Sequence, residues 1–197
     1  MKNILHVISS PSGENSVSIK LGNAIVEKLV SEYPGSIVTE INVAKNPFPH
    51  LEENLIKATR SSAAPSDDEA LKRSDKAVQQ VKETDIIVIG VPLFNFGIPS
   101  TLKSWLDNVV RPGVAFTYSE KGVQGLITDK QVYLAVASGA IYSEGPMKDF
   151  DFAAPYLEKV LNFIGVTDIT TIRAEGVNMP NLKDIALQRA IDSIAVV

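Results

Sequence analysis

Hydroxyl groups crowd the segment of residues 9–18, which holds five serines, one glycine and one asparagine but neither lysine nor arginine. Serine hydroxyls and free backbone N–H groups at the start of a helix can bind an anion without a cationic side chain. A capping role alone would need only one serine. The segment contains no Gly-Lys-Ser/Thr and no G-x-G-x-x-G pattern, so it is neither a Walker loop nor a dinucleotide fingerprint. It predicts a site for a single phosphate group.

A second candidate segment, residues 92–97, follows the apolar run of residues 86–91 and places Asn95 between Phe94 and Phe96. Aromatic residues beside a strand end commonly belong to a core. The amide between them, however, offers both a donor and an acceptor, and burying it without partners would cost about 1–3 kcal/mol. We therefore expect Asn95 to face solvent or a ligand. These residue types make a poor turn but a good floor for a flat ring.

A third loop, residues 138–145, again gathers glycine and serine after an apolar run. Open α/β sheets bind their ligands at the carboxyl ends of the strands. If the three strands are neighbours, the three loops meet at one edge of the sheet. Together they support a binding site more strongly than any one of them does alone.

The elements that must position these loops alternate between strand and helix along the whole chain. The expected strands are residues 3–8, 36–43, 86–91, 130–137 and 167–172. Six helices are expected. The first begins at residue 19 and ends before Pro34, the second spans 52–59, and the third runs from a capping box of Ser66 and Glu69 to about residue 83. The fourth contains Leu102, Leu106 and Val109 on its apolar side, the fifth spans 152–165, and the sixth spans 182–194. Residues 60–65 are expected to form a loop, and residues 114–127 a hairpin or lid. Right-handed crossovers then predict an α/β fold of three layers around a doubly wound, five-stranded parallel sheet with the order 2-1-3-4-5.

Composition limits the function classes. The 197 residues are 45% hydrophobic and 21% charged, which is typical of a soluble globular chain of about one domain. The net charge of −4 disfavours nucleic acid as a partner. The chain has no cysteine, which excludes disulfides and thiolate chemistry. No apolar segment approaches the ~20 residues of a membrane span, and the first apolar run is too short for a signal peptide, so we expect a cytoplasmic protein without a membrane partner.

The titratable residues do not suggest a metal centre. His6 lies inside the first expected strand and His50 follows a Pro-Phe-Pro turn, so both are expected to be structural. The acidic residues 67–69, Asp149 and Asp151 fall where first helical turns are expected, and the helix dipole favours them there. No Ser/His/Asp triad has local support. We expect neither a metal site nor a catalytic triad.

Taken together, these segments resemble the FMN-dependent NADH:quinone oxidoreductases, also called FMN-dependent azoreductases. The resemblance rests on Ser10 with Ser16-Val17-Ser18, on Pro92-Leu93-Phe94-Asn95-Phe96, and on Ser138-Gly139-Ala140. Supporting segments are residues 116–118, 145–150, 163–165 and 174–176. The similarity extends over essentially the whole chain. It implies a single flavodoxin-like FMN-binding domain at residues 1–197 that forms a homodimer, with non-covalent FMN near the subunit interface.

The resemblance also implies the cofactor contacts. The residues that match the family's binding positions for the FMN phosphate and ribityl chain are Ser10, Ser16, Val17 and Ser18. The residues that match the family's contacts with the isoalloxazine ring are Leu93, Phe94, Asn95, Phe96, Ser138, Gly139, Ala140 and Ile141. Two positions depart from the family pattern. The ring-contact motif often begins Met-Tyr, so Leu93-Phe94 lacks a tyrosine hydroxyl. Ala140 stands where the family commonly has a second glycine, and alanine is disfavoured if that position needs a positive φ.

The resemblance implies an enzyme that takes hydride from NADH or NADPH and delivers two electrons to a quinone or azo compound. FMN carries the chemistry, so no side chain is expected to be catalytic. With one open ring face for both reactants, we expect a ping-pong mechanism. A flavodoxin-type FMN electron carrier to a protein partner remains the alternative. A receiver-type signalling module is disfavoured, because Val91-Pro92 stands where it would need an aspartate. The sequence leaves open the physiological acceptor, the choice between NADH and NADPH, and the role of residues 114–127.

Overall fold

Five parallel strands form the central sheet of the protein in a computed structural model that describes residues 1–60, 69–120 and 122–196. In spatial order they are β2 (Ile37–Asn42), β1 (Asn3–Ile8), β3 (Ile86–Pro92), β6 (Gln131–Ser138) and β7 (Asp168–Glu175). All four pairings are parallel. The predicted α/β class and the order 2-1-3-4-5 are confirmed.

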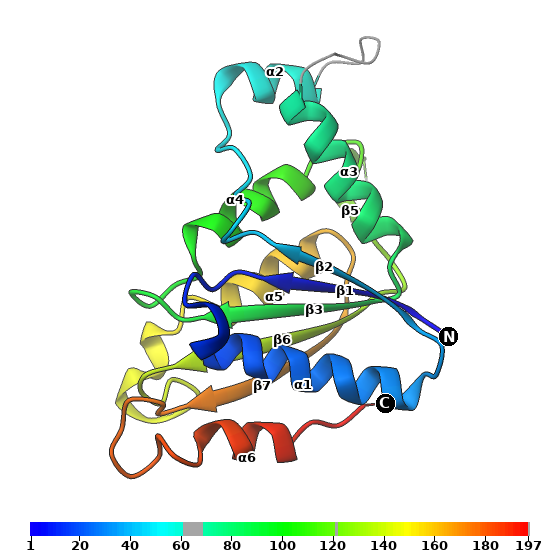
Figure 1. Cartoon of the computed structure of the whole chain (residues 1–197). Coiled ribbons are helices and arrows are strands. Elements are labelled where there is room, and N and C mark those ends of the chain that lie inside the picture. Colours follow the sequence, from blue (N-terminus) through cyan, green and yellow to red (C-terminus); the bar gives the residue numbers. More distant parts are fainter. Residues whose placement is uncertain (61–68, 121, 197) are drawn as a thin grey trace.

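Helices cover both faces of this sheet (Figure 1). The helices of the described chain are α1 (Val17–Glu32), α2 (Glu53–Arg60), α3 (Glu69–Glu83), α4 (Ser100–Val109), α5 (Ala154–Phe163) and α6 (Ala186–Asp192), with the 3-10 turns η1 (Gly13–Asn15) and η2 (Gly145–Phe150). Helix α2 packs beside α3, away from the sheet. Helices α1 and α6 lie on one face, and α3, α4 and α5 lie on the other. The result is the predicted three-layer arrangement.

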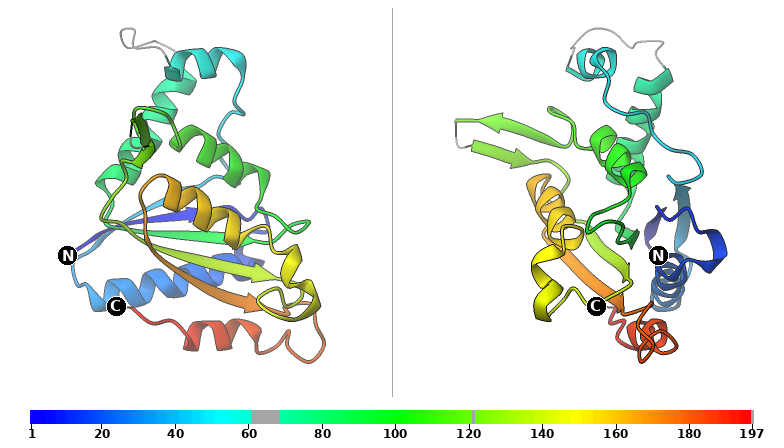
Figure 2. Two further views of the ribbon diagram at one scale, coloured as in Figure 1. Left: turned by 180° about the vertical axis from the view of Figure 1, so that it is seen from behind. Right: turned by 90° about the vertical axis from the view of Figure 1, so that its left-hand side faces the viewer.

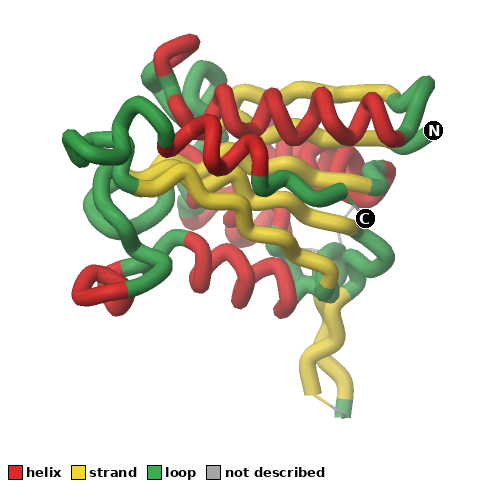
Figure 3. The backbone as a smooth tube through the Cα atoms, turned by 90° about the horizontal axis from the view of Figure 1, so that it is seen from below, coloured by secondary structure: helices red, strands yellow, loops and turns green. Residues whose placement is uncertain are grey.

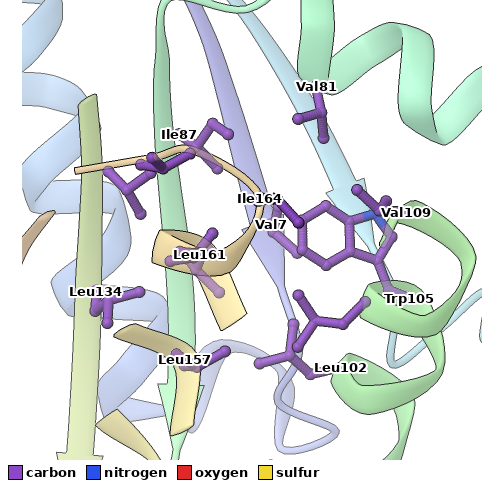
Figure 4. Close-up of a cluster of buried hydrophobic side chains, with 14 of the residues drawn as sticks. Val7, Val81, Ile87, Leu102, Trp105, Val109, Leu134, Leu157, Leu161 and Ile164 are labelled. Carbon is purple, nitrogen blue, oxygen red and sulfur yellow. The ribbon is translucent and has the colours of Figure 1, made fainter. Parts of the chain in front are cut away.

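The central strand β3 contributes to both hydrophobic cores, because successive side chains of a strand point to opposite faces. Ile87 and Ile89 belong to the cluster formed with α3, α4 and α5, while Ile86 and Val88 belong to the cluster formed with α1 and α6. Trp105 of α4 is 2% exposed within the first cluster (Figure 4). Every residue of β3 is buried, as expected for a parallel strand covered on both sides.

The strand register brings the first loop against the third strand. Ile8 of β1 is opposite Gly90 of β3. A Cβ at Gly90 would lie 3.3 Å from the carbonyl oxygen of Ser18, so a side chain there would press on the first turn of α1. Ser9 Oγ also donates to the Gly90 carbonyl at 2.6 Å. The start of α1 is therefore fixed directly above β3.

Among the boundaries that differ from the sequence predictions, three have a clear local cause. Helix α1 begins at Val17 rather than at residue 19, since the Ser16 side chain accepts from the N–H of Ile19 and caps the helix earlier. Strand β7 continues to Glu175 because its pairing with β6 extends that far. The last helix begins at Ala186 rather than at residue 182, because successive turns occupy the residues before it. Of the loop expected at 60–65, Arg60 instead ends α2, and residues 61–65 and the capping residue Ser66 lie outside the described residues.

The predicted hairpin at residues 114–127 is present. Strands β4 (Phe116–Ser119) and β5 (Gly122–Gly125) pair antiparallel and extend away from the main sheet (Figures 2 and 3). The base of the hairpin is held tightly, since a Cβ at Gly125 would lie 2.2 Å from the backbone nitrogen of Gly165. In the described part of the chain, no helix is both long enough and apolar enough to cross a membrane.

Candidate functional site

The hydroxyl-rich first loop forms a compact buried group at the start of α1. Ser10, Ser16 and Ser18 are all buried. The hydroxyl oxygens of Ser16 and Ser18 lie 3.0 Å apart, and Ser16 Oγ also accepts from the N–H of Ile19 at 3.4 Å. Capping therefore uses the Ser16 hydroxyl. Ser9 Oγ donates to the Gly90 carbonyl and Ser10 Oγ accepts from the Ser12 N–H at 3.3 Å, so the hydroxyl pair of Ser16 and Ser18 is the part of this group that lies at the helix start.

Free backbone donors complete this group. The first N–H groups of a helix have no acceptor within the helix, and no hydrogen bond among the described residues takes up those of Val17 and Ser18. They lie at the positive end of the helix dipole, beside the hydroxyls of Ser16 and Ser18. A phosphate group fits this combination without any cationic side chain.

The segment after β3 forms a tight turn, although the sequence reading judged its residues poor for one. Phe94 and Gly97 exchange two backbone hydrogen bonds of 3.0 Å. The two residues between them, Asn95 and Phe96, have φ values of 47° and 71°, in the region that glycine normally occupies in such turns. Asparagine tolerates this conformation, but phenylalanine does so at a cost of roughly 1–3 kcal/mol. Backbone strain is thus held at the tip of the turn.

The aromatic side chains of this turn are exposed rather than part of the core. Phe94 and Phe96 are 43% and 39% exposed. The Phe96 ring is in an edge contact with Tyr142 at 6.3 Å between centroids and lies 5.2 Å from the Phe150 ring. Asn95 is also exposed, so its amide faces solvent, one of the two outcomes expected for it. The turn is an aromatic surface beside a polar group.

The turn after β6 is held from behind by the residues that follow β7. The carbonyls of Ser138, Gly139 and Ala140 accept from the N–H groups of Val177, Asn178 and Gly176, at 3.1, 3.1 and 3.2 Å. With its carbonyls engaged, the turn has its N–H groups at 139–141 left over, and no hydrogen bond in the described parts of the chain involves them.

Neither small residue of this turn needs a positive φ. Non-glycine residues with positive φ in the described chain are Asn95, Phe96 and Asp129, and Ala140 is not among them. The condition under which alanine would be disfavoured is therefore not met. At Gly139 a Cβ would lie 2.7 Å from the Asn178 side-chain nitrogen, so a larger residue there would displace the Asn178 side chain.

A carboxylate that the sequence argument did not single out as a site residue fixes the next part of the loop. Glu175 Oε1 accepts from the N–H groups of Tyr142 and Ser143 at 2.8 and 2.9 Å, and Oε2 accepts from Ser143 Oγ at 2.5 Å. Because the strand was expected to end at residue 172, Glu175 was assigned to the loop that follows it. Its position as the last residue of β7, opposite Ser138 in the register, is the signal that could have revealed it.

The three loops meet at one edge of the sheet. Leu93 donates its N–H to the Ala137 carbonyl at 2.9 Å, which joins the second loop to the third, and Gly90 lies under the start of α1. The candidate residues of these loops are therefore neighbours: Ser10, Ser16, Val17 and Ser18 in the first, Leu93, Phe94, Asn95 and Phe96 in the second, and Ser138, Gly139, Ala140 and Ile141 in the third. A phosphate nest beside an aromatic turn suits a phosphorylated compound with a flat ring.

The residues expected to be structural are not gathered into a site. His6 is 2% exposed, and burial lowers its pKa to about 4. The Nδ1 atom of His50 lies 3.1 Å from Ser104 Oγ, within hydrogen-bond distance. Asp151 Oδ1 accepts from the N–H groups of Ala153 and Ala154 just before α5 begins. Asp149 lies in η2, so neither residue is in the first turn of a helix and the placement expected from the dipole is wrong for both. In the described residues no three histidine or acidic side chains could hold a metal. Asp67 and Asp68 lie outside those residues.

Comparison with known proteins gives consistent matches over the whole length. A family model described as "Flavodoxin-like fold" matches residues 2–196. An FMN-dependent NADH:quinone oxidoreductase of Beijerinckia indica is 41% identical over 99% of this chain and 98% of its own. The azoreductase from Bacillus anthracis str. Sterne superposes with a TM-score of 0.89 at 30% identity, covering 98% of this chain and 96% of that one. An FMN-dependent NADH-azoreductase from Bacillus anthracis str. Ames Ancestor, solved in complex with FMN, gives a TM-score of 0.85 at 28% identity over 98% and 95% of the two chains.

Proposed function

The chain belongs to the FMN-dependent NADH:quinone oxidoreductases of the flavodoxin-like family, and from this membership we propose that it binds FMN non-covalently and uses NADH or NADPH to reduce quinones and azo compounds. The observation that carries the proposal is the phosphate nest at the start of α1. Buried hydroxyls of Ser16 and Ser18 and the free N–H groups of Val17 and Ser18 lie together there. This neutral set of donors suits the single phosphate of FMN better than a pyrophosphate.

The other two loops are suited to the flavin ring. The exposed turn of Leu93, Phe94, Asn95 and Phe96 offers aromatic surface and an amide, and the turn at 138–141 offers backbone N–H groups. When bound, FMN supplies the chemistry, since it accepts two electrons from a reduced nicotinamide and passes them to an acceptor. The protein binds the phosphate, orients the ring through the two turns and leaves one side of it open. No side chain of the site is assigned as a general acid.

Access to the site determines the order of substrate binding and product release that we propose. With the loops at the carboxyl edge against one face of a bound ring, nicotinamide and acceptor would have to share the other face. Hydride transfer requires the nicotinamide to lie within about 3–3.5 Å of the flavin ring, which leaves no place for a second planar reactant. The oxidised nicotinamide therefore leaves before the acceptor binds, in a ping-pong cycle.

We also propose that the protein works as a homodimer. The homodimer proposal is supported by an exposed aromatic surface on the hairpin of β4 and β5 and at the end of α5. Tyr118 and Phe163 are 71% and 40% exposed, and both rings contact Phe116, at 5.5 and 4.7 Å between centroids. Exposed aromatic groups of this kind mark protein contacts. Sedimentation should give a dimer at micromolar concentration, and a fully active monomer would contradict the proposal.

One titration and one reaction test the function. The purified protein should bind one FMN per chain in preference to FAD. Under anaerobic conditions NADH should bleach the flavin absorbance, and a quinone should restore it. A flavoprotein that ignores both nicotinamides and passes single electrons to a protein partner would instead be the flavodoxin-type carrier. A protein that does not take up FMN would contradict the proposal altogether.

A further inference from the structure

Arg173 lies between the two turns that we place against the flavin ring, so this inference rests on the proposed function. It is two residues before Glu175 on β7, and alternate residues of a strand share one face. Arg173 Nη2 lies 2.7 Å from Asp151 Oδ2, and its Nη1 lies 3.7 Å from Glu175 Oε1. The side chains of Asp151, Arg173 and Glu175 are 3%, 21% and 12% exposed. They form a largely buried row of two carboxylates and one guanidinium, which we call the carboxylate row.

One end of the carboxylate row holds the turn after β6. Glu175 binds the N–H groups of Tyr142 and Ser143 through a single oxygen. These residues directly follow the 138–141 turn, whose carbonyls are held by the backbone after Glu175. A shift of Glu175 would therefore change where the free N–H groups of that turn lie.

The other end of the carboxylate row holds the turn after β3. Asp151 Oδ1 accepts from the N–H groups of Ala153 and Ala154 at 2.9 and 3.1 Å, which fixes the chain on either side of Phe152. Phe152 in turn donates its N–H to the Phe96 carbonyl at 2.9 Å. Phe96 is one of the strained residues of its turn, so an external hydrogen bond there helps to hold the conformation.

We propose that Arg173 is a positioning residue that fixes the two ring-contacting turns relative to each other, and that the net charge of the carboxylate row sets the reduction potential of the bound flavin. The formal charge of the row is −1, from two carboxylates and one guanidinium. Reduction adds negative charge at the site, and nearby carboxylates oppose it, while the guanidinium favours it. Because the row is largely buried, solvent and salt screen this effect only in part.

Two substitutions of opposite charge separate this role from a structural one. Arg173→Met makes the row more negative and should lower the potential. Glu175→Gln makes it neutral and should raise it. Each shift should correspond to a roughly three- to tenfold change in the ratio of affinities for reduced and oxidised FMN. Both variants should also bind oxidised FMN more weakly, since each loosens a turn. Simple structural damage would not move the potential in opposite directions.

Two further variants complete the experiment. Arg173→Lys keeps the charge and should leave the potential near that of the unmodified protein. Arg189→Met removes an arginine that lines the same cavity of about 170 Å³ beside Arg173 and Glu175 but is exposed, so solvent and salt screen its charge. It should shift the potential much less than Arg173→Met does and leave the affinity for FMN unchanged. If Arg173→Met does not fold, Glu175→Gln and Arg173→Lys still decide the matter. Potentials that shift in the same direction, or not at all, would overturn the proposal. Failure of the proposed function would appear earlier, as absence of FMN binding in the unmodified protein.

Discussion

The imidazole of His6 fills the space that a side chain at Gly22 would need. A Cβ placed at Gly22 would lie 2.6 Å from His6 Nε2. The histidine belongs to β1 and the glycine to α1, so this contact sets how closely the helix approaches the sheet. It also explains a glycine in the middle of a helix, where alanine would otherwise be favoured by about 0.5–1 kcal/mol.

Gly22→Ala should destabilise the protein by about 1–3 kcal/mol, the usual cost of overpacking a core. Urea denaturation measures the change, and Asn23→Ala, at an exposed position of the same helix, is the control. The cost should shrink when Gly22→Ala is combined with His6→Ala, because the clashing ring is gone. An equal cost in both backgrounds would show that His6 is not the cause.

The buried position of His6 predicts a loss of stability in mild acid. Burial disfavours the charged ring and lowers the pKa of His6 from its ordinary value of 6.5 to about 4. The unfolded chain therefore takes up this proton first as the pH falls. The neutral His6 ring therefore contributes to the free energy of unfolding in full above about pH 6.5. This contribution, up to about 3 kcal/mol, is lost as the pH falls toward about 4.

Comparison with a variant isolates this effect from other titrating groups. His6→Gln should have a smaller difference in unfolding free energy between about pH 7 and about pH 4.5 than the unmodified protein. Chemical denaturation at both pH values gives the two differences. Identical pH dependence in the two proteins would mean that His6 is protonated in the folded state as readily as in the unfolded one.

A pair of substitutions at Asn95 separates its amide from its backbone. Asn95→Gly keeps the positive φ at no cost but removes the amide, whereas Asn95→Ala removes the amide and adds strain of roughly 1–2 kcal/mol. If the amide contacts the flavin ring, both variants should bind FMN more weakly while remaining folded. Fluorescence titration measures the affinity. Weaker binding in the alanine variant alone would assign Asn95 a purely conformational role.

Replacing Ser16 and Ser18 together with alanine should weaken FMN binding by about 1–3 kcal/mol, the range for hydrogen bonds to a charged group. The helix also loses its cap, so the unfolding free energy should fall by about 1 kcal/mol. Ser12→Ala, an exposed serine of the same loop, is the control and should leave FMN binding unchanged. If the double variant keeps its affinity, the phosphate binds elsewhere.

Steady-state kinetics test the shared site for nicotinamide and acceptor. Double-reciprocal plots against NADH at several fixed quinone concentrations should be parallel, because the first product leaves before the second substrate binds. High quinone concentrations should inhibit in competition with NADH. Intersecting lines, with a ternary complex formed by an unreactive nicotinamide analogue, would instead establish a second pocket.

The sheet and its order could be predicted from the sequence because their signals are local and strong. The run at β3 is continuous and rich in β-branched residues, and the alternation of strands and helices leaves few topologies. The last helix was predicted four residues too long at its start, since the turn residues before Ala186 follow an apolar pattern that a helix would share. Local patterns cannot decide between a helix and a series of turns.

The meeting of the three loops at one edge of the sheet could be predicted from the sequence, but the internal geometry of the loops could not. Nothing in the residue types of Asn95 and Phe96 requires positive φ at both, and the strain is held by a hydrogen bond from Phe152, far along the chain. The contact of Asp151 with Arg173 likewise joins residues that no sequence pattern connects. Such long-range partners are set by the tertiary fold rather than by neighbouring residues.

The attachment of the 138–141 turn to residues 176–178 affects how the protein acquires its cofactor during synthesis. The carbonyls of that turn accept from backbone N–H groups that follow β7, and Glu175, which holds Tyr142 and Ser143, is the last residue of β7. A nascent chain that ends before β7 can already form the phosphate nest, but its third loop lacks these contacts. We therefore expect FMN to bind with full affinity only after almost the whole polypeptide has left the ribosome, and a chain that ends before β7 to bind it more weakly.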